Sequence, residues 1–165
     1  MRGAVSLLAW SAVAGLTTAP ALAACPIELA TYRDRDGVAE VEFKPVDGQA
    51  AVTNRFHMAM RGGPLFDGVV MWTEDPSRPN GMVMFNCPEG DVTGAELDAC
   101  TIWQGVIYAV DVTGEVGLLP GEGEPAPQSL ILADLAYQMR GAPGFTNAGL
   151  FSVPWDGFTL AGCQE

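Results

Sequence analysis

Apolar and polar residues alternate in short segments along this chain, most clearly between residues 52 and 61. Alternation with a period of two is typical of a β-strand that packs one face on a core and exposes the other to water. The expected core face carries Val52, Phe56, Met58 and Met60, with the polar Asn54 as the exception. The expected polar face carries Thr53, Arg55, His57 and Arg61.

Further segments have the length and apolar content of strands, and turn residues separate them. The predicted strands are residues 27–34, 38–44, 50–61, 65–74, 81–86, 101–112 and 150–160, the last weakened by Pro154. Asp36-Gly37 and Asp47-Gly48 separate the first three strands, and such pairs tolerate the positive φ angles of tight hairpin turns. We therefore expect the first three strands to form an antiparallel meander.

The two Asp-Gly turns also predict a register for this meander. A two-residue turn at the first pair places Arg33 opposite Glu40, and one at the second pair places Glu40 opposite Arg55. The result is a row across three strands in which an acid lies between two arginines. Each such cross-strand pair contributes about 0.2–1 kcal/mol.

Two segments carry helix signals. Ser129 can cap a helix over residues 130–140, although residues 130–132 are equally compatible with the start of a buried strand. A shorter helix is expected to begin at Thr93, because Thr93 and Glu96 have the spacing of a capping box. Residues 119–127, rich in glycine and proline, are expected to form a surface loop.

The chain has four cysteines, an even number that suggests pairing in an oxidising compartment and allows three connectivities. We expect the disulfides Cys87–Cys100 and Cys25–Cys163. The second would join the two ends of the domain and place the first and last strands side by side. The predicted fold is therefore mainly β: a small antiparallel sandwich or barrel with one short helix and two disulfides.

Residues 1–24 have the pattern of a cleaved secretory signal. Arg2 precedes an uncharged run that ends in the small-x-small pattern Ala21-Leu22-Ala23. Its apolar core spans about 12 residues, whereas a membrane-spanning helix needs about 20. We therefore expect residues 25–165 to form a single β-rich domain that is periplasmic or secreted.

Cys25 permits a second interpretation of the same segment. Leu22-Ala23-Ala24-Cys25 resembles a bacterial lipobox, in which Cys25 would carry a lipid and anchor the protein to the membrane. Lipidation would leave one of the other cysteines without a partner, and the residues after Cys25 resemble a strand rather than a polar tether. The disulfide is the favoured interpretation, and the lipid-anchored lipoprotein is the alternative.

The charge of the chain narrows the classes of partner. The formal net charge is −12, and removal of Arg2 with the signal leaves 7 basic against 20 acidic residues. This balance argues against nucleic acid and anionic membranes as partners. It suits a basic envelope protein, and the sequence leaves the oligomeric state open.

Few residues suggest chemistry. His57 is the only histidine, and no nucleophile motif accompanies it, so no residue is identified as catalytic and we expect a protein that is not an enzyme. His57, Met58 and Met60 are loosely similar to the His/Met arrangement of periplasmic copper chaperones, because thioether and imidazole groups suit Cu(I). Methionines on an inward face are more often core residues, so no cofactor or metal ligand is assigned.

The acidic loop between Cys87 and Cys100 and the tryptophans raise two more candidates. The acids of that loop do not have the spacing of an EF-hand, so a solvated loop is expected rather than a Ca²⁺ site. Trp72, Trp103 and Trp155 lie in or beside predicted strands, where rings more often fill a core than line the mouth of a barrel.

These features favour a non-enzymatic binding or inhibitor-type module that acts on a protein partner. Small periplasmic lysozyme inhibitors are broadly similar in size, export, disulfides and β meander. The resemblance implies that an acidic inhibitor would be steered to a basic lysozyme. The alternative is a periplasmic carrier of a small ligand or of copper.

Overall fold

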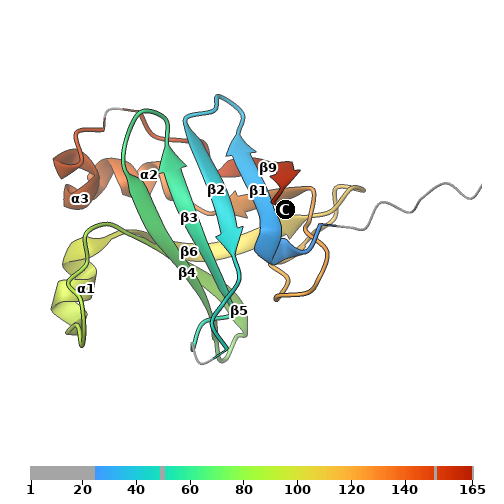
Figure 1. Ribbon diagram of the computed structural model, residues 1–165, viewed down its shortest axis with the longest axis horizontal. Coiled ribbons are helices and arrows are strands. Elements are labelled where there is room, and N and C mark those ends of the chain that lie inside the picture. The colour runs from blue at the N-terminus through green and yellow to red at the C-terminus, as the bar shows by residue number, and fades with distance from the viewer. Residues whose placement is uncertain (1–24, 49–50, 151, 165) are drawn as a thin grey trace, which may run out of the picture.

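The strands of this protein close into a barrel. The computed structural model describes residues 25–48, 51–150 and 152–164, and its eight antiparallel barrel strands follow one another in the order β1, β2, β3, β4, β5, β6, β8, β9 and back to β1 (Figure 1). Their bounds are β1 (Ala30–Asp34), β2 (Ala39–Lys44), β3 (Asn54–Met60), β4 (Leu65–Thr73), β5 (Arg78–Met84), β6 (Thr101–Val110), β8 (Ser129–Leu132) and β9 (Gly157–Cys163). The predicted β-rich fold is confirmed, and ring closure selects the barrel over the sandwich.

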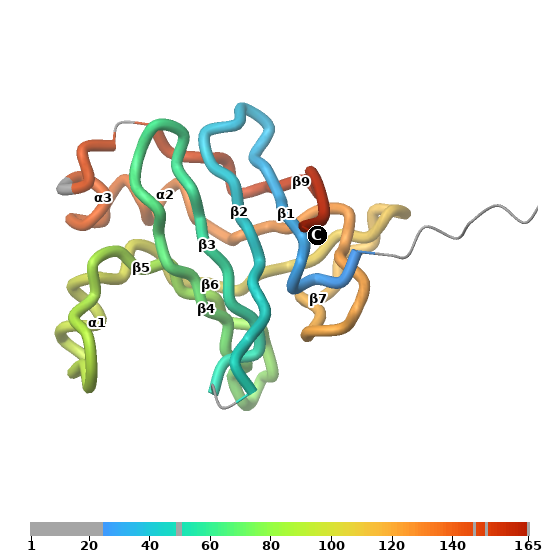
Figure 2. The backbone as a smooth tube through the Cα atoms, in the orientation of Figure 1, coloured from blue at the N-terminus to red at the C-terminus, as the bar shows by residue number. Residues whose placement is uncertain are grey.

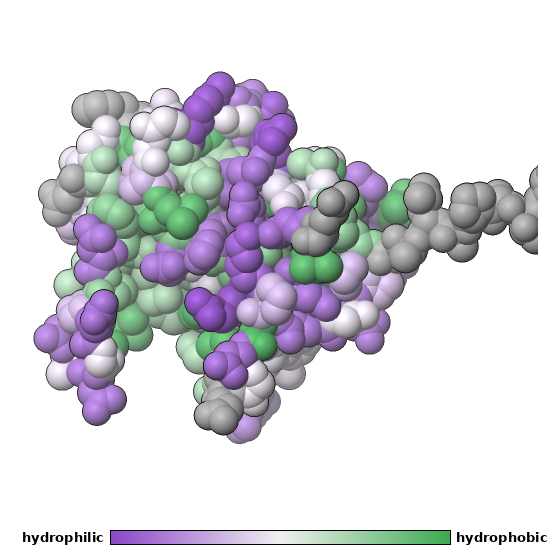
Figure 3. Space-filling model, viewed as in Figure 1, coloured by the Kyte–Doolittle hydropathy of each residue, from purple (hydrophilic) through white to green (hydrophobic). Residues whose placement is uncertain are grey.

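Side chains fill the barrel, because eight strands leave an interior just wide enough for them. The largest fully buried side chains are Trp103, Tyr32, Phe43, Phe56, Phe66, Phe158, Ile27, Met58, Ile107, Leu119, Leu130 and Leu132. Gly68 makes room for one of these rings: a Cβ at this position would lie 2.2 Å from Cε2 of Phe56. The outer surface over β1 and β2 is mostly hydrophilic, and hydrophobic side chains gather over β3 and β4 (Figure 3).

The predicted register is correct for the first hairpin and wrong for the second. Arg33 lies opposite Glu40, and its Nε donates to Glu40 Oε2 at 2.9 Å. Glu40, however, lies opposite Ala59 on β3, and Arg55 lies opposite Lys44. A two-residue turn at Asp47-Gly48 would have placed Pro45 inside the ladder, where it has no N–H to donate, so β2 ends at Lys44 and a longer loop follows.

The error in register leaves the faces of β3 unchanged. Glu40 was expected opposite Arg55 and lies opposite Ala59, a shift of four residues. Because the side-chain period of a strand is two, an even shift keeps each side chain on its expected side of the sheet. Met58 and Met60 therefore point into the core as predicted, and Asn54 is buried among them.

The predicted helix over residues 130–140 is partly wrong. Its first residues form β8, the alternative that the sequence allowed, and α2 (Leu135–Gly141) begins later. A further short helix, α3 (Pro143–Asn147), follows it. The run of apolar residues at 130–132 pairs with β6 and β9, so burial in the ring overrides its helical propensity.

The helix at Thr93 is confirmed as α1 (Gly94–Cys100). Thr93 Oγ1 accepts a hydrogen bond from Glu96 N at 3.4 Å, and Thr93 N donates to Glu96 Oε2 at 2.9 Å, which completes the capping box. These hydrogen bonds lower the pKa of the Glu96 carboxyl below its ordinary value. In Figures 1 and 2 this helix extends away from the barrel.

The ends of the chain differ in detail from the prediction. A short 3-10 helix, η1 (Ile27–Leu29), occupies the start of the first predicted strand, and the last strand is β9 rather than residues 150–160. Pro154 lies before β9, in agreement with the poor fit of proline to a ladder. β9 pairs with β1, so the first and last strands are neighbours as expected.

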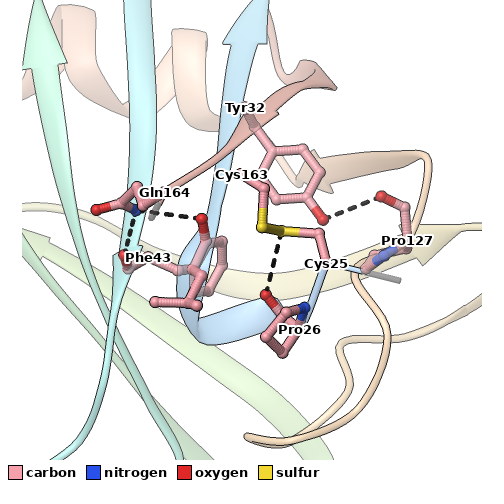
Figure 4. The surroundings of a disulfide bond; sticks show 8 residues. Cys25, Pro26, Tyr32, Phe43, Pro127, Cys163 and Gln164 are labelled. Carbon is pink, nitrogen blue, oxygen red and sulfur yellow. Dashed lines mark hydrogen bonds between the residues drawn. A yellow bond between two sulfur atoms is a disulfide. The ribbon is translucent and has the colours of Figure 1, made fainter. Parts of the chain in front are cut away.

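Both predicted disulfides are confirmed. Cys25 and Cys163 lie 5.8 Å apart between Cα atoms and join the segment before β1 to the end of β9 (Figure 4). Cys87 and Cys100 lie 5.2 Å apart and connect the segment after β5 to the end of α1. Disulfides of this kind indicate an oxidising compartment outside the cytoplasm.

The predicted signal, residues 1–24, and the boundary of the domain lie outside the described residues. No helix in the described part of the chain is long and apolar enough to cross a membrane.

Candidate binding site

One end of the barrel is covered by residues 119–128, which we call the strap. The predicted surface loop over residues 119–127 is confirmed for most of this segment, whereas Leu119 is fully buried and fills this end of the core. Backbone hydrogen bonds tie it to the segment before β1: Ile27 N donates to Glu124 O at 2.9 Å, and Ala126 N donates to Cys25 O at 2.8 Å. Figure 2 shows the strap as an orange loop beside β7 and the start of β1.

Two buried polar side chains hold the strap from inside the barrel. Tyr32 Oη donates to Pro127 O at 3.0 Å (Figure 4), and burial raises the pKa of the Tyr32 hydroxyl far above its ordinary value. Asn54 Nδ2 donates to Pro120 O at 3.1 Å. The polar exception in the β3 pattern is therefore explained, because Asn54 anchors the strap to the barrel wall.

A groove of about 490 Å³ lies between the strap and the hairpin of β6 with β7 (Val116–Leu118). We call it the acidic groove. Its lining is mostly apolar but includes the carboxylates of Asp111 and Glu115. The lining residues are Ala109, Asp111, Val112, Glu115, Gly117, Leu118, Pro120, Pro125, Ala126, Pro127 and Gln128. Three prolines stiffen the strap side, so this wall is formed before any ligand arrives.

Asp111 organises the turn that forms the other wall. Its Oδ1 accepts hydrogen bonds from Thr113 N and Thr113 Oγ1, both at 2.7 Å, and from Glu115 N at 2.9 Å. Gly114 completes the turn at a φ of 89°, a conformation that favours glycine. The hydrogen bonds, first of all that of the Thr113 side chain, lower the pKa of Asp111, so this carboxylate remains charged in mild acid.

Further acids lie against the strap. Glu28 Oε2 accepts from Gly123 N at 2.9 Å, and Glu122 accepts from Val46 N, so these two carboxylates also fasten the strap. Glu115 and Glu124 are exposed, and their side chains make no hydrogen bond or salt bridge with another described residue. The groove thus combines apolar walls with carboxylates that have spare hydrogen-bonding capacity.

The structure separates the residues of the copper hypothesis. His57 lies on the outer face of β3, with Nε2 3.5 Å from Asp67 Oδ1 on β4. Met58 and Met60 point into the core, on the opposite side of the same strand. The imidazole and these thioethers therefore do not meet.

The acids between Cys87 and Cys100 are exposed on α1 and the segment before it. Among the described residues, no three His, Cys, Asp or Glu side chains are grouped closely enough to hold a metal ion. Of the tryptophans, Trp103 is buried in the core and donates from Nε1 to Ala133 O at 2.8 Å, whereas Trp72 and Trp155 are largely exposed. The core interpretation is confirmed for Trp103 and wrong for the other two.

The sequence did not identify the acidic groove. Its walls come from two segments that each contain a recognisable signal: an Asp-x-Thr-Gly turn and a proline-rich loop. The strap follows β7 directly and leads into β8, and because β7 and β8 both pair with β6, the strap lies against the β6–β7 hairpin. Comparison of the chain with protein-family models, curated proteins and solved structures finds no match.

Proposed function

We propose that this protein is a non-enzymatic binding module that recognises a basic segment of a protein partner through the acidic groove. The observation that supports the proposal is the composition of that groove, in which Asp111 and Glu115 lie beside apolar walls. A lysine or arginine side chain has a matching structure, an aliphatic stem and a cationic end. Its stem would lie along the prolines while its charged end meets the carboxylates.

The charge of the whole molecule supports the same partner chemistry. A net charge of −12 attracts a basic protein over distances of about a Debye length, 8–10 Å at physiological salt. Such steering raises the association rate more than the affinity and weakens as salt is added. The hydrogen bonds that lower the pKa of Asp111 favour its charged form, so this carboxylate contributes to the attraction.

We also infer that the protein is exported and acts in the periplasm or outside the cell. Two disulfides support an oxidising compartment, and the pattern of residues 1–24 supports secretion. Because Cys25 Sγ is bonded to Cys163, the disulfide and a lipid on the same sulfur exclude each other. Intact-mass analysis of the mature protein with and without reductant distinguishes the two forms.

Calorimetric titration with lysozyme, a basic protein, tests the groove. Glu115→Lys should weaken binding at least tenfold, about 1.4 kcal/mol, because the introduced lysine would repel the basic side chain of the partner. Asp98→Lys changes the net charge by the same amount on α1, and Asp98 is exposed. This control should weaken binding by less than about threefold through long-range charge alone.

Two results would contradict the proposal. Equal weakening by both variants would mean that only the net charge matters. Absence of salt-dependent binding, both to lysozyme and to a synthetic lysine- and arginine-rich peptide, would exclude a basic partner.

A further inference from the structure

A second cavity lies at the opposite end of the barrel, where α2 and the segment before β9 meet the β1–β2 turn. It has a volume of about 670 Å³, and we call it the aromatic cavity. The side chains that matter for its chemistry are Asp36, Tyr137, Arg140, Trp155 and Asp156. None of them lines the acidic groove, so the two sites are independent.

Trp155 is held rigidly although it is 47% exposed. Its Nε1 donates to Asp36 Oδ2 at 2.6 Å, and the guanidinium carbon of Arg35 lies 3.6 Å from the ring centroid. Both contacts come from the β1–β2 turn, so the ring is oriented before any ligand binds. An exposed and oriented indole loses little conformational entropy on binding.

Tyr137 supplies a second aromatic wall from α2. It is 81% exposed, which is unusual for a large ring. Arg140 follows three residues later in the same helix and is also exposed, so the two side chains lie on neighbouring positions of one helix face. Two rings and a guanidinium group therefore border the same space.

The polar groups of the aromatic cavity carry both signs of charge. Asp156 Oδ1 accepts from Ala136 N at 2.8 Å, which fixes the carboxylate at the start of α2. Arg140 lines the cavity together with Asp36 and Asp156, whereas only carboxylates carry charge in the acidic groove. Hydrogen-bond donors and acceptors thus stand side by side around the aromatic rings.

We propose that the aromatic cavity binds a short neutral oligosaccharide. Each sugar hydroxyl can donate to a carboxylate and accept from a guanidinium group, and the C–H face of a pyranose ring stacks on an aromatic side chain. The volume lies within the range of about 300–1,000 Å³ that is typical of sites for small ligands. This site goes beyond the proposed protein-binding function and does not depend on it.

Titration with tetrasaccharides of glucose, mannose and N-acetylglucosamine, each alone, tests the site through tryptophan fluorescence and calorimetry. At least one should bind with a Kd of about 1 mM or lower and change the emission of Trp155. Tyr137→Ala should weaken this binding about tenfold or more, and because the side chain is exposed the variant should fold normally. Trp155→Phe should remove the fluorescence change and weaken binding.

Matched controls separate this proposal from that of the acidic groove. Trp72→Phe replaces another exposed tryptophan outside the cavity and should leave sugar binding unchanged, as should Glu115→Lys. The proposal is overturned if no sugar binds at about 10 mM, or if Tyr137→Ala leaves sugar binding intact. Loss of lysozyme binding in Tyr137→Ala without any sugar binding would overturn it as well, because the rings would then belong to a protein interface.

Discussion

Removal of the disulfide that joins the chain ends should destabilise the protein more than removal of the disulfide beside α1. The Cys25–Cys163 bond spans 138 residues, whereas Cys87–Cys100 spans 13. In the chain-entropy description, loops of these lengths restrict the unfolded chain by about 5 and about 3 kcal/mol at 25 °C. The double variant Cys25→Ser with Cys163→Ser should therefore lose about 2 kcal/mol more than the double variant Cys87→Ser with Cys100→Ser.

The folded state adds to this difference. Ala126 N donates to the carbonyl of Cys25, and Gln164 Nε2 donates to Phe43 O at 2.9 Å (Figure 4), so both ends of the long link contact other elements. Without the Cys25–Cys163 disulfide, these contacts have to hold the two chain ends in place by themselves.

Urea unfolding at 25 °C, followed by far-UV circular dichroism, measures both losses against the oxidised parent. Serine replaces each cysteine in both variants, so the variants differ mainly in the loop that is opened. Thermal melts should agree, with Tm lowered by roughly 4 °C per kcal/mol for a domain of this size. Equal losses, or a larger loss for the short loop, would refute the reasoning from loop length.

Three further predictions concern the core, the strap and the turn. Gly68→Ala should destabilise the fold by about 1–3 kcal/mol, because the added Cβ would overlap the ring of Phe56. In the control Gly117→Ala the added Cβ meets no atom within 4 Å, so the free energy of unfolding should change by less than about 1 kcal/mol. Urea titration compares the two variants. Tyr32→Phe should lose about 1 kcal/mol and speed amide exchange in the strap, because Pro127 O loses its buried donor; unchanged exchange would contradict this role. The pKa of Asp111 is lowered in the folded state. Its contribution to the stability of the turn is therefore present above the ordinary carboxyl pKa and is lost as the pH falls through the pKa of the folded state. Protection of the turn amides against exchange, measured relative to the intrinsic rate at each pH, should therefore fall over that acidic range, and Asp111→Asn should remove this change in protection.

Local patterns predicted the strands and their faces well. The period-two pattern around Phe56 identified the inward side of β3, and the even shift in register preserved that side. The capping-box spacing of Thr93 and Glu96 located α1, because this interaction is confined to one helical turn and needs no distant segment. Cysteine parity and position predicted both disulfides.

Features that depend on distant segments were not predictable in this way. β8 is short, and only its pairing with β6 and β9 makes residues 129–132 a strand. The strap resembles a surface loop in sequence, and the burial of Leu119 follows from barrel closure. The aromatic cavity combines segments that meet only in the folded chain: Asp36 and Trp155 are 119 residues apart.

Chemical-shift mapping tests the central proposal, docking of a basic partner in the acidic groove, most directly. Isotope-labelled protein is titrated with lysozyme at low salt, and the amide signals of each described residue are followed. The proposal predicts that the largest shifts fall on the non-proline residues within 109–118 and 120–128 and reverse when salt is added. Shifts confined to α2 and residues 153–157, or no shifts with either lysozyme or the lysine- and arginine-rich peptide, would contradict it.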